Sequence, residues 1–230
     1  MNTIMPWNGY EMLALLLCGC FTACIGALLI KAATLVGALL NRLHGKFVRL
    51  ILGGLALSCI LIVFPMLRGQ GYESIEQLLI GDDSVVTQAS WILRRLPPAW
   101  LPCLILFAVF ILKPIASALT IGIGDGGIFA PTIFIGAFAG YTFAKCVNML
   151  GLGTLNTCNF AAFGICGVFA TVMRSPLTAI FLVIETTGQL VLMAPLMVVS
   201  AVSVIIGHFM VPSSIYRGTK VGDKHGEQKA

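Results

Sequence analysis

A run of apolar and small residues from Met12 to Ile30 decides most of what this chain can fold into. Thr22 is its only interruption in 19 positions, and the run continues past Lys31 to Leu40. A helix of about 20 apolar residues can cross the hydrocarbon core of a bilayer. Over the whole chain, 58% of residues are hydrophobic and 10% are charged. This composition is unlike that of soluble domains and predicts an integral membrane protein.

The other apolar segments predict an all-α, polytopic membrane bundle with about six to eight helical segments. A second span is expected over Leu50–Leu67, and a third over Ala99–Ile121 with a proline kink at Lys113-Pro114. The spacing of apolar residues in Ser74–Ile80 favours a short amphipathic helix. Further helices are expected over Ile128–Met149, Asn159–Met173, Pro176–Thr187 and Leu190–Val211.

Basic residues gather in two places outside the predicted spans. The loop from Asn41 to Arg49 and the tail after Tyr216 each carry several lysines, arginines or histidines. The positive-inside rule places both in the cytoplasm. We therefore expect residues 1–216 to form one membrane region in a cell membrane, and residues 217–230 to form a short cytoplasmic tail. The net charge of +5 is scattered along the chain, which argues against a nucleic-acid partner.

The stretch from Gly122 to Gly140, GIGDGGIFAPTIFIGAFAG, interrupts the apolar segments with a glycine-rich loop. Glycines allow a sharp turn and a close approach to a ligand, and Pro131 suits the first turn of a helix that opens near Ile128. Such a helix start presents free N–H groups and the positive end of the macrodipole, so it can bind an anion. The alternative is a glycine hinge between two helices. Gly136-x-x-x-Gly140 predicts a small face for helix packing.

The same glycines match the dinucleotide fingerprint G-x-G-x-x-G, but the context argues against that function. The fingerprint requires a short strand before it and an acidic residue about 20 positions later. Here the preceding segment is much longer than a strand, and the next carboxylate after Asp125 is Glu185.

A second break lies at Arg174-Ser175-Pro176, between two apolar segments that are each shorter than a full span. Two partial helices joined by a tight turn predict a V-shaped or re-entrant arrangement. Paired short segments with Gly or Pro breaks indicate a transporter-type binding site near the midplane of the membrane.

Charged and titratable residues inside apolar segments are candidates for function. Glu185 is either a proton relay or a carboxylate held by local hydrogen bonds near a helix end. Lys113 is either functional or, the interpretation we favour, a lysine that extends to the membrane interface. His208 has no neighbouring ligand type and is interpreted as a buried or interfacial packing histidine.

Catalytic and metal chemistry find no support in the sequence. Nearly all of the eight cysteines lie inside apolar runs, and Cys18-x-Cys20 has neither a nearby histidine nor a second pair at zinc spacing. No hydrolase or nucleotide-binding motif occurs. We predict no enzyme activity, no catalytic residue, no metal site and no cofactor.

Three motifs resemble the CLC family of chloride channels and chloride/proton antiporters. Gly127-Ile128-Phe129-Ala130-Pro131 is similar to the family's G-[IV]-F-x-P signature. Residues 174–179, RSPLTA, and 185–188, ETTG, resemble its RxPLTA and E-x-T-[GD] region. Tyr216 stands where the family has its central pore tyrosine. The similarity runs from about Leu13 to Tyr216 and corresponds to the second half of the family's membrane domain.

The resemblance implies that chloride is the ligand and that the function is chloride transport, by a channel or an antiporter. It implies that the backbone N–H groups of Ile128 and Phe129 and the hydroxyl of Tyr216 bind the anion. The glycine-rich anion loop would comprise Gly124, Gly126, Gly127 and Pro131.

The family's first-half motifs, G-S-G-I-P and G-[RK]-E-G-P with its gating glutamate, do not occur in these 230 residues. We therefore expect the chain to pair with a separate N-terminal half or to form a homodimer. The alternative is a truncated or structural membrane fragment without transport activity of its own.

Overall fold

Helices account for most of the part of the chain that the structure describes. The computed structural model describes residues 9–41, 46–63, 71–80, 112–120 and 127–212, and no strand occurs within these ranges. The all-α class predicted from the sequence is confirmed. In chain order the elements are α1 (Gly9–Asn41), α2 (Lys46–Val63), α3 (Tyr72–Ile80), a helical segment over 112–120, α6 (Phe129–Met149), α7 (Thr157–Met173), α8 (Pro176–Thr187), η3 (Leu190–Leu192) and α9 (Met193–Met210).

Three of the described helices are long and apolar enough to cross a membrane. They cover Tyr10–Leu39, Phe129–Met149 and Leu190–Met210, whereas α7 and α8 are shorter apolar helices. The predicted helix bounds agree with the structure to within a few residues for α1, α6, α7, α8 and the last helix. Most of the predicted third span lies outside the described residues, which include only residues 112–120 of it, and these are helical.

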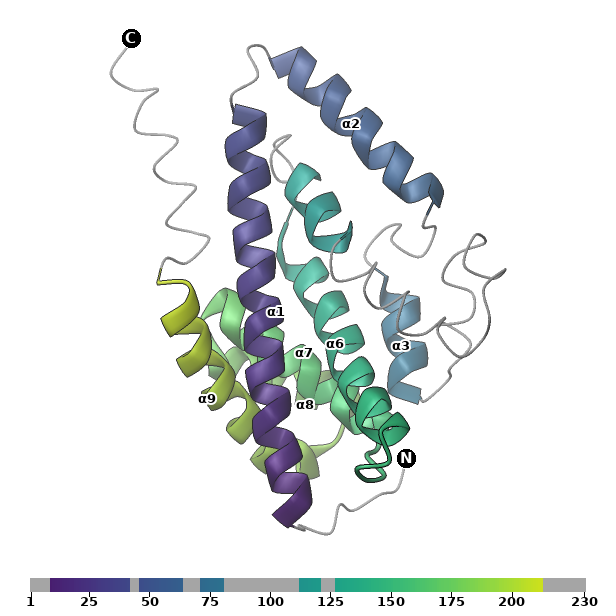
Figure 1. Ribbon diagram of the computed structural model, residues 1–230, viewed down its shortest axis with the longest axis vertical. Coiled ribbons are helices and arrows are strands. Elements are labelled where there is room, and N and C mark those ends of the chain that lie inside the picture. Colours follow the sequence, from purple (N-terminus) through teal and green to yellow (C-terminus); the bar gives the residue numbers. More distant parts are fainter. Residues whose placement is uncertain (1–8, 42–45, 64–70, 81–111, 121–126, 213–230) are drawn as a thin grey trace.

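Helix α7 forms the centre of the bundle. Every residue from Asn159 to Val172 is buried, as expected for a helix that is apolar on all sides. It packs against α1, α6, α8 and α9, and to a smaller extent against α3. Figure 1 shows α1 in front of this centre, with α6 and α9 on either side of it and α2 slanting across the top.

Small residues let α6 and α7 approach each other backbone to backbone. A Cβ atom on Gly136 would lie 2.6 Å from the Cα atom of Ile165, and one on Gly164 would lie 2.2 Å from the carbonyl oxygen of Gly136. Neither position has room for a side chain. The predicted Gly136-x-x-x-Gly140 packing face is confirmed, and it fixes the position of α6 on the central helix.

Hydroxyl groups join α1, α7 and α9 on the other side of the centre. The hydroxyls of Thr22 and Ser203 are 2.9 Å apart, and the hydroxyl of Thr171 donates to the carbonyl of Ser203 over 3.0 Å. All three side chains are buried. Each hydroxyl also has a backbone acceptor, so all three of these buried hydroxyls are hydrogen-bonded.

A two-residue turn connects α7 to α8. Arg174 ends α7 in the left-handed conformation, with φ 54° and ψ 34°, and Pro176 opens α8 at its first turn. The guanidinium of Arg174 donates a hydrogen bond to the carbonyl of Val211, the residue after α9. The tight turn predicted at these residues is therefore present, and the arginine connects it to the end of the last helix.

Lys113 contradicts the interpretation that it extends to the membrane interface. Its side chain is only 4% exposed, and its Nζ lies 4.5 Å from the centroid of the Phe134 ring on α6. A cation over the face of a buried aromatic ring gains about 2 kcal/mol, which offsets part of the cost of burying the lysine. The sequence could not show this contact, because Phe134 lies 21 positions from Lys113 and on another helix.

Candidate anion site

The candidate site begins where α6 begins. Ile128 precedes the helix with φ −90° and ψ −12°, and no side chain caps this end. The helix starts at Phe129, one residue from the predicted start at Ile128. Pro131 is its third residue. An N–H at this position would have no acceptor within the helix, so proline, which lacks an N–H, loses no hydrogen bond here.

The first N–H groups of α6 have no acceptor in the described part of the chain. No described residue accepts a hydrogen bond from the N–H of Ile128, Phe129 or Ala130. The helix is 21 residues long, so its macrodipole adds about half a positive charge at this end. A helix start without a side-chain cap is an arrangement that can accept an anion.

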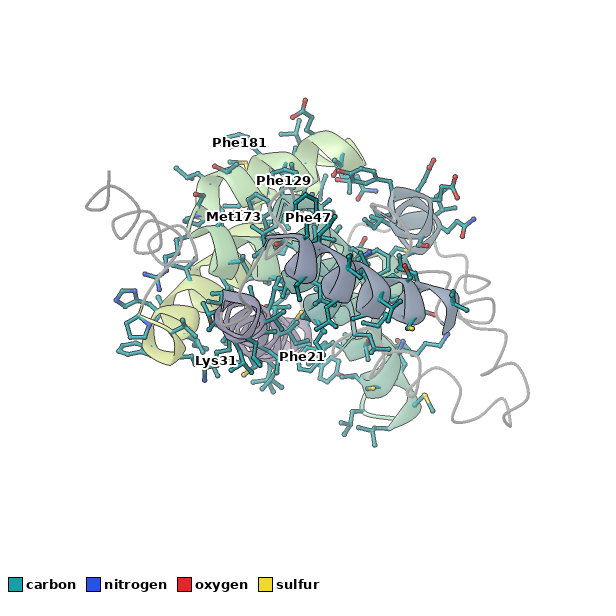
Figure 2. All side chains as sticks on the ribbon, turned by 90° about the horizontal axis from the view of Figure 1, so that it is seen from above. Phe21, Lys31, Phe47, Phe129, Met173 and Phe181 are labelled. Atoms are coloured by element: carbon teal, nitrogen blue, oxygen red, sulfur yellow. The ribbon has the colours of Figure 1, made fainter. Side chains whose placement is uncertain are left out.

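The surroundings of this helix start differ on its two sides. Ile128 is buried, and Gly127 is exposed with open space where a side chain would be. The Phe129 side chain is 43% exposed. Its ring forms a T-shaped pair with Phe169 from α7, with ring centroids 5.1 Å apart and an interplanar angle of 85°. The helix start is therefore held by the core on one side and open on the other. Figure 2 labels Phe129 on the bundle seen from above.

Thr132 is a residue of this region that sequence reasoning missed. Its side chain is fully buried, and its hydroxyl donates to the carbonyl oxygen of Ile128 over 2.6 Å. The spacing of four residues between a threonine and a helix-start carbonyl is visible in the sequence. Such bonds are common in helices, however, and do not indicate a site by themselves.

Several predicted site residues lie outside the described part of the chain. These are Gly124 and Gly126 of the predicted anion loop, and Tyr216. Of the predicted site, the structure describes Gly127, Ile128, Phe129 and Pro131, which it brings together at the start of α6. Whether these residues bind an anion stays a prediction.

Glu185 and Arg174 do not pair. Arg174 caps the end of α7, whereas Glu185 is exposed near the end of α8 and forms no hydrogen bond or ion pair with another described residue. The expectation that local hydrogen bonds hold this carboxylate is therefore not met within the described residues. His208 in the last turn of α9 is also exposed. The buried alternative is therefore wrong for this residue, and the interfacial one stays a prediction.

A bundle of apolar helices built around a buried central helix, with an uncapped helix start at its edge, defines a polytopic helical membrane protein. Comparison with known sequences makes the assignment specific. The sequence model of the voltage gated chloride channel family matches residues 1–208. The chain belongs to this family, and the resemblance described from its motifs is confirmed.

Individual relatives agree with the family assignment. The H(+)/Cl(-) exchange transporter ClcA of Vibrio campbellii is 32% identical over 168 residues, which cover 72% of this chain and 32% of the relative. The voltage-gated ClC-type chloride channel ClcB of Escherichia coli O81 is 26% identical over 208 residues, which cover 83% of this chain and 46% of the relative. The chain thus spans about a third to a half of the length of the curated relatives it matches.

Solved structures share the fold. A eukaryotic CLC transporter matches with a TM-score of 0.68 and 22% identity, over 94% of this chain and 35% of the other. A CLC-type fluoride/proton antiporter matches with a TM-score of 0.69 and 21% identity, over 95% of this chain and 48% of the other. The described helices therefore form part of the CLC membrane fold.

Proposed function

We propose that this chain supplies one half of a chloride pathway across a cell membrane, as part of a CLC-type channel or antiporter. The observation that carries the proposal is the start of α6, where the N–H groups of Ile128 and Phe129 have no acceptor among the described residues. Family membership supports chloride as the ion, because the named relatives are a chloride exchanger and a chloride channel.

Backbone dipoles suit the transport of an anion. N–H groups replace part of the hydration shell of chloride, yet they hold it more weakly than a full positive charge would. The hydroxyl of Tyr216 is proposed as a further donor, and the loop residues Gly124 and Gly126 as the backbone that approaches the ion. This chemistry needs no cofactor, and chloride itself is the ligand.

Pairing is part of the proposal, because the chain covers only part of its relatives. The partner is either a polypeptide that carries the first-half motifs of the family or a second copy of this chain. Exposed apolar side chains on α8 support a partner surface: Leu177 is 67% and Phe181 58% exposed, and Figure 2 shows Phe181 at the outer edge of the bundle. We place the tail from residue 217 in the cytoplasm.

The test uses what we call the paired protein: this chain purified together with a polypeptide that carries the G-S-G-I-P and G-[RK]-E-G-P motifs. Isothermal titration calorimetry should show binding of chloride and bromide and none of sodium. Tyr216→Phe should weaken halide binding by about 0.5 to 1.5 kcal/mol, the net contribution of one hydrogen bond.

Tyr72→Phe provides the matched control, because Tyr72 is half exposed at the start of α3. This variant should bind halide like the wild type. Binding of sodium in place of halide would contradict the proposed function. A halide affinity unchanged in Tyr216→Phe would place Tyr216 away from the ion.

A further inference from the structure

Thr132 directs two donors at one carbonyl group. Its backbone N–H donates to the carbonyl oxygen of Ile128 over 3.1 Å, as the first intrahelical bond of α6. Its hydroxyl donates to the same oxygen over 2.6 Å. The side chain is 0% exposed, so water does not compete for this bond.

That carbonyl belongs to the peptide group whose N–H is offered to the anion. The peptide between Ile128 and Phe129 carries the carbonyl of the first residue and the N–H of the second. In a trans peptide these two groups point in opposite directions. Holding the carbonyl of Ile128 toward Thr132 therefore holds the N–H of Phe129 away from the helix, toward its open start.

The same two bonds also polarise the peptide group. Hydrogen bonds in a chain strengthen one another, because each polarises the group that makes the next. A carbonyl that accepts two bonds leaves its N–H a better donor. The T-shaped contact between the rings of Phe129 and Phe169 also restrains Phe129.

We propose that Thr132 is a positioning residue for anion binding, which orients and polarises the N–H of Phe129 through the carbonyl of Ile128. The inference rests on the proposed function and adds to it a residue that does not itself touch the ion. It predicts that the hydroxyl of Thr132 contributes to halide affinity separately from its contribution to folding.

Thr142 supplies a matched control within the same helix. It is buried, and its hydroxyl also donates to the carbonyl four residues earlier, that of Phe138. There the N–H of the following residue, Ala139, lies in the middle of α6 and is used by the helix itself. The two threonines thus make the same local bond, but only one bond acts on a peptide group at the helix start.

The experiment measures chloride and bromide affinity by calorimetry, and thermal unfolding, for variants of the paired protein. Thr132→Val keeps the shape and removes the hydroxyl, and should weaken halide binding roughly twofold to tenfold, the equivalent of one hydrogen bond. Thr132→Ser restores the hydroxyl and should recover most of the affinity. Thr142→Val should change halide affinity by less than about twofold, whatever it does to the unfolding temperature.

The outcomes separate this inference from the proposed function. Absence of halide binding in the wild-type paired protein would remove the proposed function, and this inference with it. Halide binding that is equal in the wild type and Thr132→Val, or equally weakened in Thr132→Val and Thr142→Val, would overturn the role of Thr132 alone. If Thr132→Val does not fold, Thr132→Cys, which keeps the volume and donates only weakly, replaces it under the same criteria.

Discussion

Gly140 on α6 faces Phe160 on α7 so closely that a Cβ atom on the glycine would lie 1.7 Å from the phenylalanine carbonyl oxygen. No rotation of a side chain can relieve this contact, since the clash is with backbone. Replacing Gly140 by alanine must therefore move one helix away from the other.

Gly140→Ala should lower the unfolding temperature of the chain in detergent. Its free energy of unfolding should fall by about 1 to 3 kcal/mol, the usual cost of overpacking a core. Gly37→Ala is the control, because Gly37 lies in α1 with nothing within 4 Å of an added Cβ atom. The stability of the Gly37→Ala variant should stay the same or rise, since alanine favours a helix by about 1 kcal/mol over glycine. Equal effects of the two changes would contradict the close packing of α6 on α7.

Ser203→Ala should destabilise the contact between α1 and α9. The hydroxyl of Ser203 reaches both the Thr22 hydroxyl and the carbonyl of Gly19, at 2.9 and 3.0 Å. A double-mutant cycle with Thr22→Val should give a coupling energy of about 0.6 kcal/mol, the usual size for interhelical hydrogen bonds in membranes. Ser58→Ala removes a hydroxyl that bonds only within α2, and it should leave the unfolding temperature nearly unchanged. Additive losses in the cycle would mean that the two hydroxyls act independently.

Arg174→Asn should loosen the end of α9 by removing the bond to the carbonyl of Val211. Asparagine tolerates the left-handed backbone of this position. The free energy of unfolding should therefore fall only by the contribution of the guanidinium hydrogen bond, about 1.5 to 3 kcal/mol for a charged donor. Thermal unfolding and hydrogen exchange at the end of α9 measure it. Arg174→Gly removes the same bond while relaxing the backbone further, and should lose less stability. Wild-type stability in Arg174→Asn would show that the bond is not needed.

The 230-residue chain alone should not catalyse chloride flux. The family's first-half motifs do not occur in the chain, so an ion held at the start of α6, where Gly127 and the ring of Phe129 are exposed, would lack the groups that we expect those motifs to supply. Chloride efflux from liposomes containing only this chain should equal that from empty vesicles, and the paired protein should exceed both. Efflux from the chain alone that responds to Tyr216→Phe would mean that two copies build a pathway by themselves.

Periodicity and glycine spacing predicted much of this fold from the sequence. The long helices and the small face of α6 follow from local patterns, because lipid requires every backbone polar group to find its partner within the helix. The start of α6 was predicted to within one residue from Pro131 and the glycines before it. The family motifs then supplied the chloride hypothesis, which helix patterns cannot provide.

Contacts between distant segments were not predictable in this way. Lys113 lies under the Phe134 ring, and Arg174 reaches Val211 across 37 positions. In the sequence, Lys113 lies within an apolar segment and Arg174 lies at the break between two apolar segments. These two contacts are with an aromatic face and a backbone carbonyl, and neither kind of contact leaves a charge pattern in the sequence. Thr132 was missed because its bond resembles those of threonines inside any helix.

The length of α1 determines where α2 can begin relative to the membrane. The 33 residues of α1 rise about 50 Å at 1.5 Å per residue, compared with a hydrocarbon core about 30 Å thick. Even a tilt of about 40°, the upper end of the usual range, leaves roughly 38 Å along the membrane normal. At least one end of α1 must therefore stand in the headgroup layer or beyond it. The basic residues that follow α1 in the sequence, Arg42 and His44, favour the C-terminal end as the one that leaves the hydrocarbon core. We therefore expect α2 to begin in the headgroup layer and not within the hydrocarbon.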